Sequence, residues 1–193
     1  MLGRVVNEKK DGRLERGKAR RELLLDAAVT VIAESGAGLL THRAVAAQAG
    51  VSLASVTYHF PGIAELRQSA FDHAGSRIGL AFRALVEAHH ETPGSLPELA
   101  GNYALTLTGE SRQDTVAVFA MILASSHDES LRPVIRELDG HLADLLENYV
   151  GDHATALILS SSIQGLILTH LATGTGPDEL RTSVTTLVRR FAS

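Results

Sequence analysis

Apolar residues recur along this chain at the three- and four-residue spacing of an amphipathic helix. Residues 20–35 carry the first such stripe, made up of Leu24, Ala27, Ala28, Val31 and Ile32. Gly36 follows the stripe, and glycine is the residue type that most often ends a helix. Apolar and polar residues do not alternate with the period of a strand in any segment. The pattern predicts an all-helical chain whose first helix covers residues 20–35.

Two short helices are predicted next, over residues 42–49 and 53–59. Thr41 and Ser52 directly precede these runs, and both residue types are favoured as helix N-caps. Gly50 lies in the turn between them and tolerates the positive φ that a tight turn requires. Neither run is long enough to be stable alone in water, so each depends on packing against the rest of the chain.

Small and aliphatic side chains in this segment suit two helices joined by a tight turn. Ala46 lies where the helices of such a unit approach each other. The residues with the spacing to form the shared core are Val45, Val51, Val56 and Phe60. These features are typical of a helix-turn-helix unit, whose second helix enters the major groove of DNA while caps and hydroxyls hold phosphates.

The rest of the chain also has the helical pattern. Pro61-Gly62 separates the short helices from a long one, and Ser95-Leu96-Pro97-Glu98 has the residues of a capping box. The predicted helices cover residues 63–90, 95–108, 114–126, 131–150, 153–173 and 178–191. With the first three, they give about nine helices.

The uncharged stretch over residues 153–177 is long enough for a transmembrane span. Polar residues interrupt it, including Ser160, Ser161 and Gln164. We therefore interpret it as a helix buried against other protein, and we expect no membrane association.

The net charge of −4 conceals an uneven distribution along the chain. Residues 1–60 hold 9 Lys+Arg against 6 Asp+Glu, a charge of +3, and residues 61–193 hold 9 against 16, a charge of −7. Residues 1–21 alone hold 8 basic and 3 acidic residues. Such asymmetry is typical of a basic arm beside a DNA-binding surface, and an ordinary solvated tail would look the same. We expect residues 1–19 to form a disordered basic arm.

Residue types and spacings disfavour several other classes of protein. The absence of cysteine excludes disulfides and thiolate metal sites. The N-terminus has no apolar run of signal-peptide length, so we expect a cytoplasmic protein. His89 and His90 are adjacent and so point to different faces of a helix, and no His-Glu-x-x-His, Gly-x-Ser-x-Gly or glycine-rich phosphate motif occurs. We expect no catalytic site, metal or cofactor.

The segment over residues 20–66 resembles the TetR family of bacterial transcriptional regulators. It reads RRELLLDAAVTVIAESG, LLTHRAVAAQAGVS, LASVTYHF and PGIAEL, in the family's order of a first helix, a helix-turn-helix and a helix opening after a His-Phe pair. Beyond this quarter of the chain, the similarity lies in helix count, length and an apolar C-terminal helix pair. The resemblance implies a three-helix DNA-binding domain over residues 20–62 and a helical ligand-binding and dimerisation domain over residues 63–193.

Roles in DNA binding follow from the resemblance, position by position. The residues concerned are Thr41, Arg43, Ser52, Leu53, Ala54, Ser55, Thr57, Tyr58 and His59. Those on the first turns of the second short helix correspond to base-reading positions, and the caps and rings correspond to backbone contacts. The chain departs from the family at Thr57, where an aromatic is common, and at Gly62-Ile63-Ala64, where a lysine is common.

The resemblance also implies a ligand pocket and a dimer interface in the second domain. Ligand candidates are Phe82, Tyr103, Arg112, Phe119, Met121 and His127, and dimerisation candidates are Ile158, Ser161, Gly165, Leu168 and Leu187. Because aromatic residues make up only 4% of the chain, the pocket should be mainly aliphatic.

Three functions remain open on these grounds. The first is a homodimeric repressor released from a palindromic double-stranded operator by a small, mainly apolar molecule; repression is the family's default. The second is an architectural or constitutive DNA-binding protein without an effector. The third is a helix-turn-helix protein whose second domain binds another protein. The many apolar helices after residue 62 favour the first.

Overall fold

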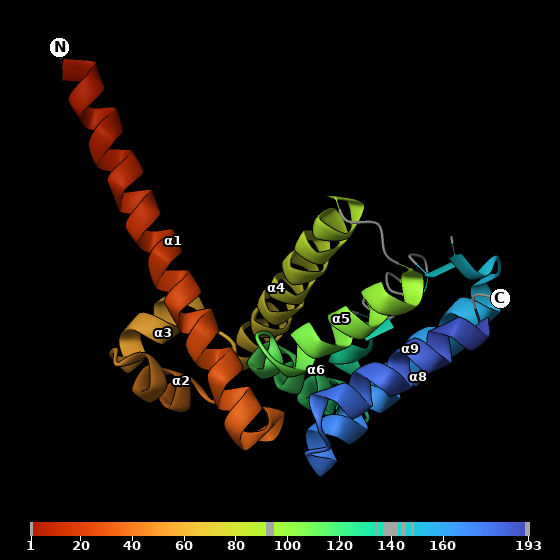
Figure 1. The fold of residues 1–193 in the computed structure, drawn as a ribbon. Helices are drawn as coiled ribbons and strands as arrows, with labels where there is room; N and C mark the ends of the chain where they lie inside the picture. The colour runs from red at the N-terminus through yellow and green to blue at the C-terminus, as the bar shows by residue number, and fades with distance from the viewer. Residues whose placement is uncertain are drawn as a thin grey trace. The chain divides into compact units, whose positions relative to one another are not determined.

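The computed structural model describes residues 2–91, 95–133, 135–136, 143, 146–147 and 149–191. Within these residues the chain forms eight α-helices, two 3-10 helices and no strand (Figure 1). The predicted all-α fold is confirmed. The helix predicted over residues 131–150 lies largely outside the described residues.

The elements follow one another in the predicted order. They are α1 (Leu2–Ser35), η1 (Ala37–Leu39), α2 (His42–Ala49), α3 (Leu53–His59), α4 (Ile63–Glu91), α5 (Leu96–Thr108), α6 (Arg112–Ala124), η2 (Glu129–Leu131), α8 (His153–Thr173) and α9 (Pro177–Phe191). The chain divides into two compact units, residues 1–73 and residues 74–193, and the division falls within α4.

Helix α1 begins at Leu2 instead of near residue 20. The structure thus gives helix over the segment that the sequence predicts to be a disordered arm. Residues 2–19 contain no proline and are rich in Lys, Arg and Glu, which have high helix propensity. Glu15 and Lys18 also pair across one turn at 3.9 Å. The apolar stripe marks where α1 enters the core, and it does not mark where the helix starts.

The core of the first unit is the one that the stripe on α1 predicts. Its fully buried members include Leu24, Ala28, Ile32, Val45, Val56 and Phe60, all with 0% exposure. Val51, predicted to belong to this core, is only half-buried because it lies in the turn between α2 and α3. Its backbone N–H nevertheless donates to the Ala46 carbonyl at 3.0 Å, which closes the turn.

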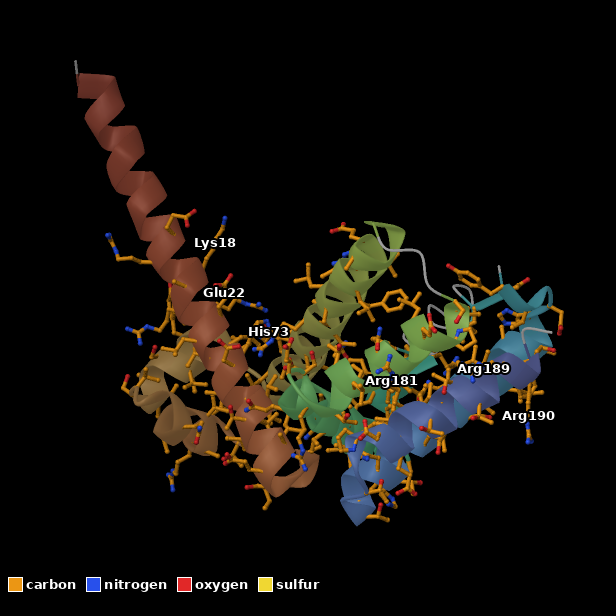
Figure 2. All side chains as sticks on the ribbon, viewed as in Figure 1. Lys18, Glu22, His73, Arg181, Arg189 and Arg190 are labelled. Atoms are coloured by element: carbon orange, nitrogen blue, oxygen red, sulfur yellow. The ribbon has the colours of Figure 1, made fainter. Side chains whose placement is uncertain are left out.

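The first turns of α4 pack in the first unit. Leu66 is fully buried there. His73 on α4 is hydrogen-bonded to Asp26 on α1, with Nε2 and Oδ1 separated by 2.8 Å, and Figure 2 shows His73 beside α1. Arg21 on α1 donates through Nη2 to Ser69 Oγ at 3.0 Å. These contacts explain why the unit ends later than the predicted boundary.

The second unit is built around α5, α8 and α9, and the last two helices run side by side (Figure 1). Its fully buried side chains include Ala104, Ala156, Leu159, Val184 and Val188. Helices α5 and α9 approach closely at Gly101, where an added Cβ would lie 2.9 Å from Thr185 Cγ2. Only glycine therefore fits there without a shift of the neighbouring side chains.

Helix ends in this unit follow local signals. The predicted capping box is present: the Ser95 N–H donates to Glu98 Oε2 at 3.1 Å. The predicted bounds of α8 are confirmed, with Asp152 as N-cap and Gly174 in the left-handed conformation as C-cap. Helix α6 begins and ends two residues earlier than predicted, at Arg112 and Ala124.

A partly buried ion pair joins α4 to α6 within the second unit. Arg77 Nε lies 3.0 Å from Asp114 Oδ2, and the exposed fractions of the two side chains are 45% and 5%. A carboxylate this well buried is tolerated because the guanidinium offsets its lost hydration. The pair fixes the part of α4 that directly follows the unit boundary.

Candidate functional site

The helix-turn-helix is held by two N-caps. Thr41 Oγ1 accepts a hydrogen bond from the Ala44 N–H at 3.0 Å, and Ser52 Oγ accepts one from the Ser55 N–H at 3.2 Å. Both capping predictions are confirmed. Each hydroxyl uses an acceptor lone pair for the cap, and both residues are exposed, so each O–H group remains able to donate to a phosphate oxygen.

The turn between α2 and α3 depends on Gly50. Its backbone lies in the left-handed region, at φ 64° and ψ 36°. A side chain at this position would add roughly 1–2 kcal/mol of strain. The predicted need for positive φ at this residue is confirmed, and the turn sets the direction in which α3 presents its outer face.

The outer face of α3 combines apolar surface with few free donors. Leu53 is 44% exposed, and Ala54 and Thr57 are also exposed, whereas Val56 is fully buried. Thr57 Oγ1 lies 3.2 Å from the carbonyl oxygens of both Leu53 and Ala54, so the backbone holds its hydroxyl proton. Thr57 therefore offers a base edge its methyl group and an acceptor lone pair.

The end of α3 presents an exposed ring. Tyr58 is 82% exposed, and its ring meets that of His59 edge to face, with centroids 5.1 Å apart. His59 is half-buried. Of the other residues predicted to contact DNA, Arg43 is exposed on α2 and Ser55 is half-buried on α3. The structure therefore brings all the predicted DNA residues together on α2, α3 and their caps.

Two supporting contacts were not predicted from the sequence. His42 Nε2 lies 2.7 Å from the Phe60 carbonyl oxygen, so this nitrogen carries the proton and ties the start of α2 to the end of α3. The guanidinium of Arg21 lies 4.8 Å above the centre of the Phe60 ring. Both contacts join residues that are distant in sequence, so no local sequence pattern predicts them.

Basic side chains continue along α1 beyond this domain core. Arg16, Lys18 and Arg20 are exposed, and Figure 2 shows Lys18 projecting from the helix. They belong to the segment of 8 basic and 3 acidic residues. The first unit thus carries a positive charge excess on the helix that supports the helix-turn-helix.

A cavity of about 390 Å³ lies in the second unit. It is lined by Phe82, Arg83, Val86, Glu87, Leu96, Leu99, Ala100, Tyr103, Leu146, Tyr149 and Ile163. We name it the first cavity. Two of the predicted ligand residues, Phe82 and Tyr103, belong to its wall, and their rings meet edge to face with centroids 5.0 Å apart.

A second cavity, of about 320 Å³, lies in the same unit. It is lined by Ile78, Tyr103, Leu107, Thr115, Val118, Phe119, Ile122, Ile135, Ser161, Ile163, Gln164 and Ile167. The predicted ligand residue Phe119 belongs to this wall. Tyr103 and Ile163 are shared with the first cavity.

The other predicted ligand residues line neither cavity. Arg112 is exposed at the start of α6, and His127 is exposed in the turn after it. Met121 is fully buried among its neighbours. Sequence reasoning missed Glu87 and Tyr149, because nothing in their local sequence shows that they reach a common cavity.

Burial raises the pKa of Tyr103 from 10.0 to about 12. The folded protein therefore holds the phenol proton more tightly than the unfolded chain does, and folding stability contributed by the neutral form is lost as pH rises from about 10 to about 12. We expect Tyr103→Phe to lose less stability than wild type over this pH range, as measured by urea unfolding at each pH. An equal loss in both proteins would contradict the assignment.

An outward stripe of α8 is apolar or small. Ile158 and Leu168 are 55% and 49% exposed, and Ser161 and Gly165 are exposed between them. The opposite side of α8 is buried in its own chain. Leu187, the predicted dimerisation residue on α9, differs from these four because it packs partly against the core of its own unit.

The described residues also bear on two other kinds of site, a membrane span and a metal site. Among these residues, α8 is long and apolar enough to cross a membrane by length and composition. The core helix of a soluble protein passes the same test, so length and composition alone do not assign α8 to a membrane. In the same part of the chain, no group of three His, Asp or Glu side chains is placed to hold a metal ion.

Family comparisons match both units. Residues 24–70 match the family described as "Bacterial regulatory proteins, tetR family". Residues 91–193, which are more than half of the chain, match the family described as "Tetracyclin repressor-like, C-terminal domain". The chain belongs to the TetR family. It is a DNA-binding transcriptional regulator, and the match over both regions extends the similarity well beyond the helix-turn-helix.

Solved structures of TetR-family proteins resemble the chain over most of its length. A TetR-family member from Streptomyces coelicolor A3 is 31% identical, with a TM-score of 0.69 over 87% of this chain and 97% of that one. The multidrug binding protein EbrR complexed with imidazole is 30% identical, with a TM-score of 0.67 over 87% and 94%. EbrR complexed with ethidium is 32% identical, with a TM-score of 0.64 over 87% and 98%. No curated protein matches the chain.

Proposed function

We propose that this TetR-family regulator is a homodimeric repressor that leaves a palindromic operator when a planar, mainly apolar molecule fills the first cavity. The observation that carries the proposal is the position of α4. Its first turns pack in the DNA-binding unit, and its later turns supply Phe82 and Val86 to the cavity wall. One continuous helix thus contributes to both sites.

At the DNA end, α3 is the element that enters the major groove. Thr41, Ser52 and Tyr58 would contact phosphates, which position a protein without reading sequence. Leu53 and Thr57 face outward and have little donor capacity to offer. Base preference should therefore rest on contacts with thymine methyl groups and on DNA shape.

At the effector end, the wall of the first cavity favours a flat aromatic molecule. Phe82, Tyr103 and Tyr149 supply rings, and the remaining wall is largely aliphatic. Glu87 gives the wall a carboxylate, which suits a cationic ligand, and Arg83 also lines this wall. The structure of EbrR with ethidium, a planar cation, supports this ligand class for a protein 32% identical to this one.

Control of DNA binding would pass along α4. His73 and Ser69 hold its early turns to α1, and Arg77 holds its next turn to Asp114 on α6. A ligand that contacts Phe82 would favour the arrangement of α4 and its contacts to which the ligand binds more tightly. Such a ligand shifts the balance only as far as it prefers the arrangement that cannot bind DNA.

The outward stripe of α8 is the proposed dimer surface. Ile158, Ser161, Gly165 and Leu168 recur at spacings of three and four residues, which places them in one line along the helix. An exposed apolar line of this kind is stabilised when a second copy of the helix covers it across a twofold axis. A twofold dimer would bind half-sites about one helical turn of DNA apart, or a multiple of that.

The proposal is tested by calorimetry with an operator selected from random DNA duplexes. We expect ethidium to weaken operator binding by about 5- to 150-fold, and operator to weaken ethidium binding by the same factor, because coupling is reciprocal. Val86→Trp should fill the first cavity and remove both effects. Leu80→Trp is the matched control, since Leu80 is on the same helix but 58% exposed and outside the wall.

Equal ethidium affinity with and without operator would show that the two sites are not coupled. The protein would then be an architectural or constitutive DNA-binding protein. Failure to select any DNA sequence would instead contradict the operator itself.

A further inference from the structure

The second cavity differs chemically from the first. The wall of the first includes Arg83 and Glu87, whereas no charged residue lines the second. Its volume of about 320 Å³ lies at the lower end of the range of about 300–1,000 Å³ that is usual for small-molecule sites. An uncharged, mostly aliphatic wall disfavours a cation, because a charge there would lose its hydration without a partner.

Tyr103 and Ile163 lie where the two cavities meet. Each residue lines both, so the two cavities adjoin at these side chains of α5 and α8. The Tyr103 ring is supported on one side by Phe82, which belongs to the first cavity only. A small ligand that stays on one side of these two side chains leaves the space on the other side available.

The second cavity also contains hydrogen-bonding groups that suit a neutral ligand. Tyr103 and Ser161 each bring a hydroxyl group to its wall. The raised pKa of Tyr103 keeps its phenol neutral and able to donate. A neutral ligand with a hydrogen-bond acceptor could take a hydrogen bond from either hydroxyl.

Ser161 connects this cavity with the proposed dimer surface. It lines the second cavity and also belongs to the outward stripe of α8. A second copy packed on that stripe would cover this part of the wall. Water would then be excluded more completely than in a single chain, which strengthens the preference for an apolar occupant.

We propose that the second cavity is a separate site for a neutral, largely apolar molecule of two or three rings that carries a hydrogen-bonding group. It is filled while the first cavity is occupied. The proposal deepens the proposed function and rests on it, because it takes the first cavity as the site of the planar effector. Each subunit would then hold two ligands of different chemistry, separated by Tyr103 and Ile163.

The test uses the full-length protein and two probes in calorimetric titrations. Ethidium reports on the first cavity, and the neutral amine N-phenyl-1-naphthylamine reports on the second. We expect the neutral amine to bind the ethidium-saturated protein with an affinity within about threefold of its affinity for the free protein, a difference too small to reflect competition for one site. This measurement uses the wild-type chain and does not depend on any variant.

Matched substitutions then assign the probes to the cavities. Val86→Trp fills the first cavity and Ile122→Trp fills the second; both residues are half-buried and each lines one cavity only. Each should weaken its own probe by at least about tenfold and leave the other unchanged, because a side chain of this size occupies the space of the ligand. Leu123→Trp, at a neighbouring residue that is 74% exposed, is the control for Ile122→Trp.

The outcomes separate this inference from the proposed function. If one probe displaces the other, and if Val86→Trp alone weakens the binding of both probes, the second site is overturned and the effector site stays in place. Ethidium binding that is insensitive to Val86→Trp would overturn the effector site, whereas loss of the neutral amine in Ile122→Trp would still support the second cavity. If neither probe binds, both the effector site and the second site are overturned.

Discussion

Replacing Thr41 and Tyr58 together by alanine should weaken operator binding by at least about 100-fold. Both residues are exposed at the ends of the helix-turn-helix, and we place both against phosphates. A hydrogen bond to a charged group contributes about 1.5–3 kcal/mol, so the loss of two contacts in each subunit exceeds a factor of 100. Fluorescence anisotropy with selected and scrambled duplexes should show weaker binding to both alike, because phosphate contacts carry no sequence information.

Conservative variants separate contact from folding in this experiment. Thr41→Ser keeps the cap to Ala44, and Tyr58→Phe keeps the ring without its hydroxyl. Because Thr41→Ala also removes a cap, it should lower folding stability by about 1 kcal/mol, which thermal unfolding measures independently. If the double variant stays folded and binds its operator unchanged, the assignment of this surface to DNA is wrong. Thr57→Ala, in contrast, should alter which bases are preferred.

Gly165→Arg should convert the dimer into monomers while each chain stays folded. An added Cβ at Gly165 meets no atom within 4 Å in the single chain, so the substitution has room there. In the proposed dimer, the guanidinium would be buried against its own copy across the twofold axis, which costs several kcal/mol. Sedimentation velocity should show the loss of the dimer. Operator affinity should fall by roughly 10²–10⁴, because the two half-sites are then bound independently.

A matched glycine provides the control for this substitution. Gly38 is exposed in the first unit, and an added Cβ there also meets no atom within 4 Å. Gly38→Arg adds the same side chain and charge but should leave the dimer intact. A wild-type protein that sediments as a monomer at micromolar concentration would remove the dimer surface on α8, and with it the twofold operator.

The sequence by itself determined the helix-turn-helix almost to the residue. Thr41, Gly50 and Ser52 specify the bounds of α2 and α3, and the structure confirms the cap at each hydroxyl and the positive φ at the glycine. The bounds of α8 were equally predictable. Such signals act within one helical turn, because a cap or a left-handed residue satisfies backbone groups only three or four positions away. Nearby residues are therefore enough to read them.

Only the tertiary structure decided which distant side chains share a space. Phe82, Tyr103 and Tyr149 meet in one cavity although no local pattern links them, and Arg112 and His127 remain outside it. The early turns of α4 belong to the first unit through contacts with α1 that join residues far apart in the chain. Periodicity shows which face of a helix is apolar, but the partner of that face depends on how the helices pack, and cavities form where that packing is incomplete.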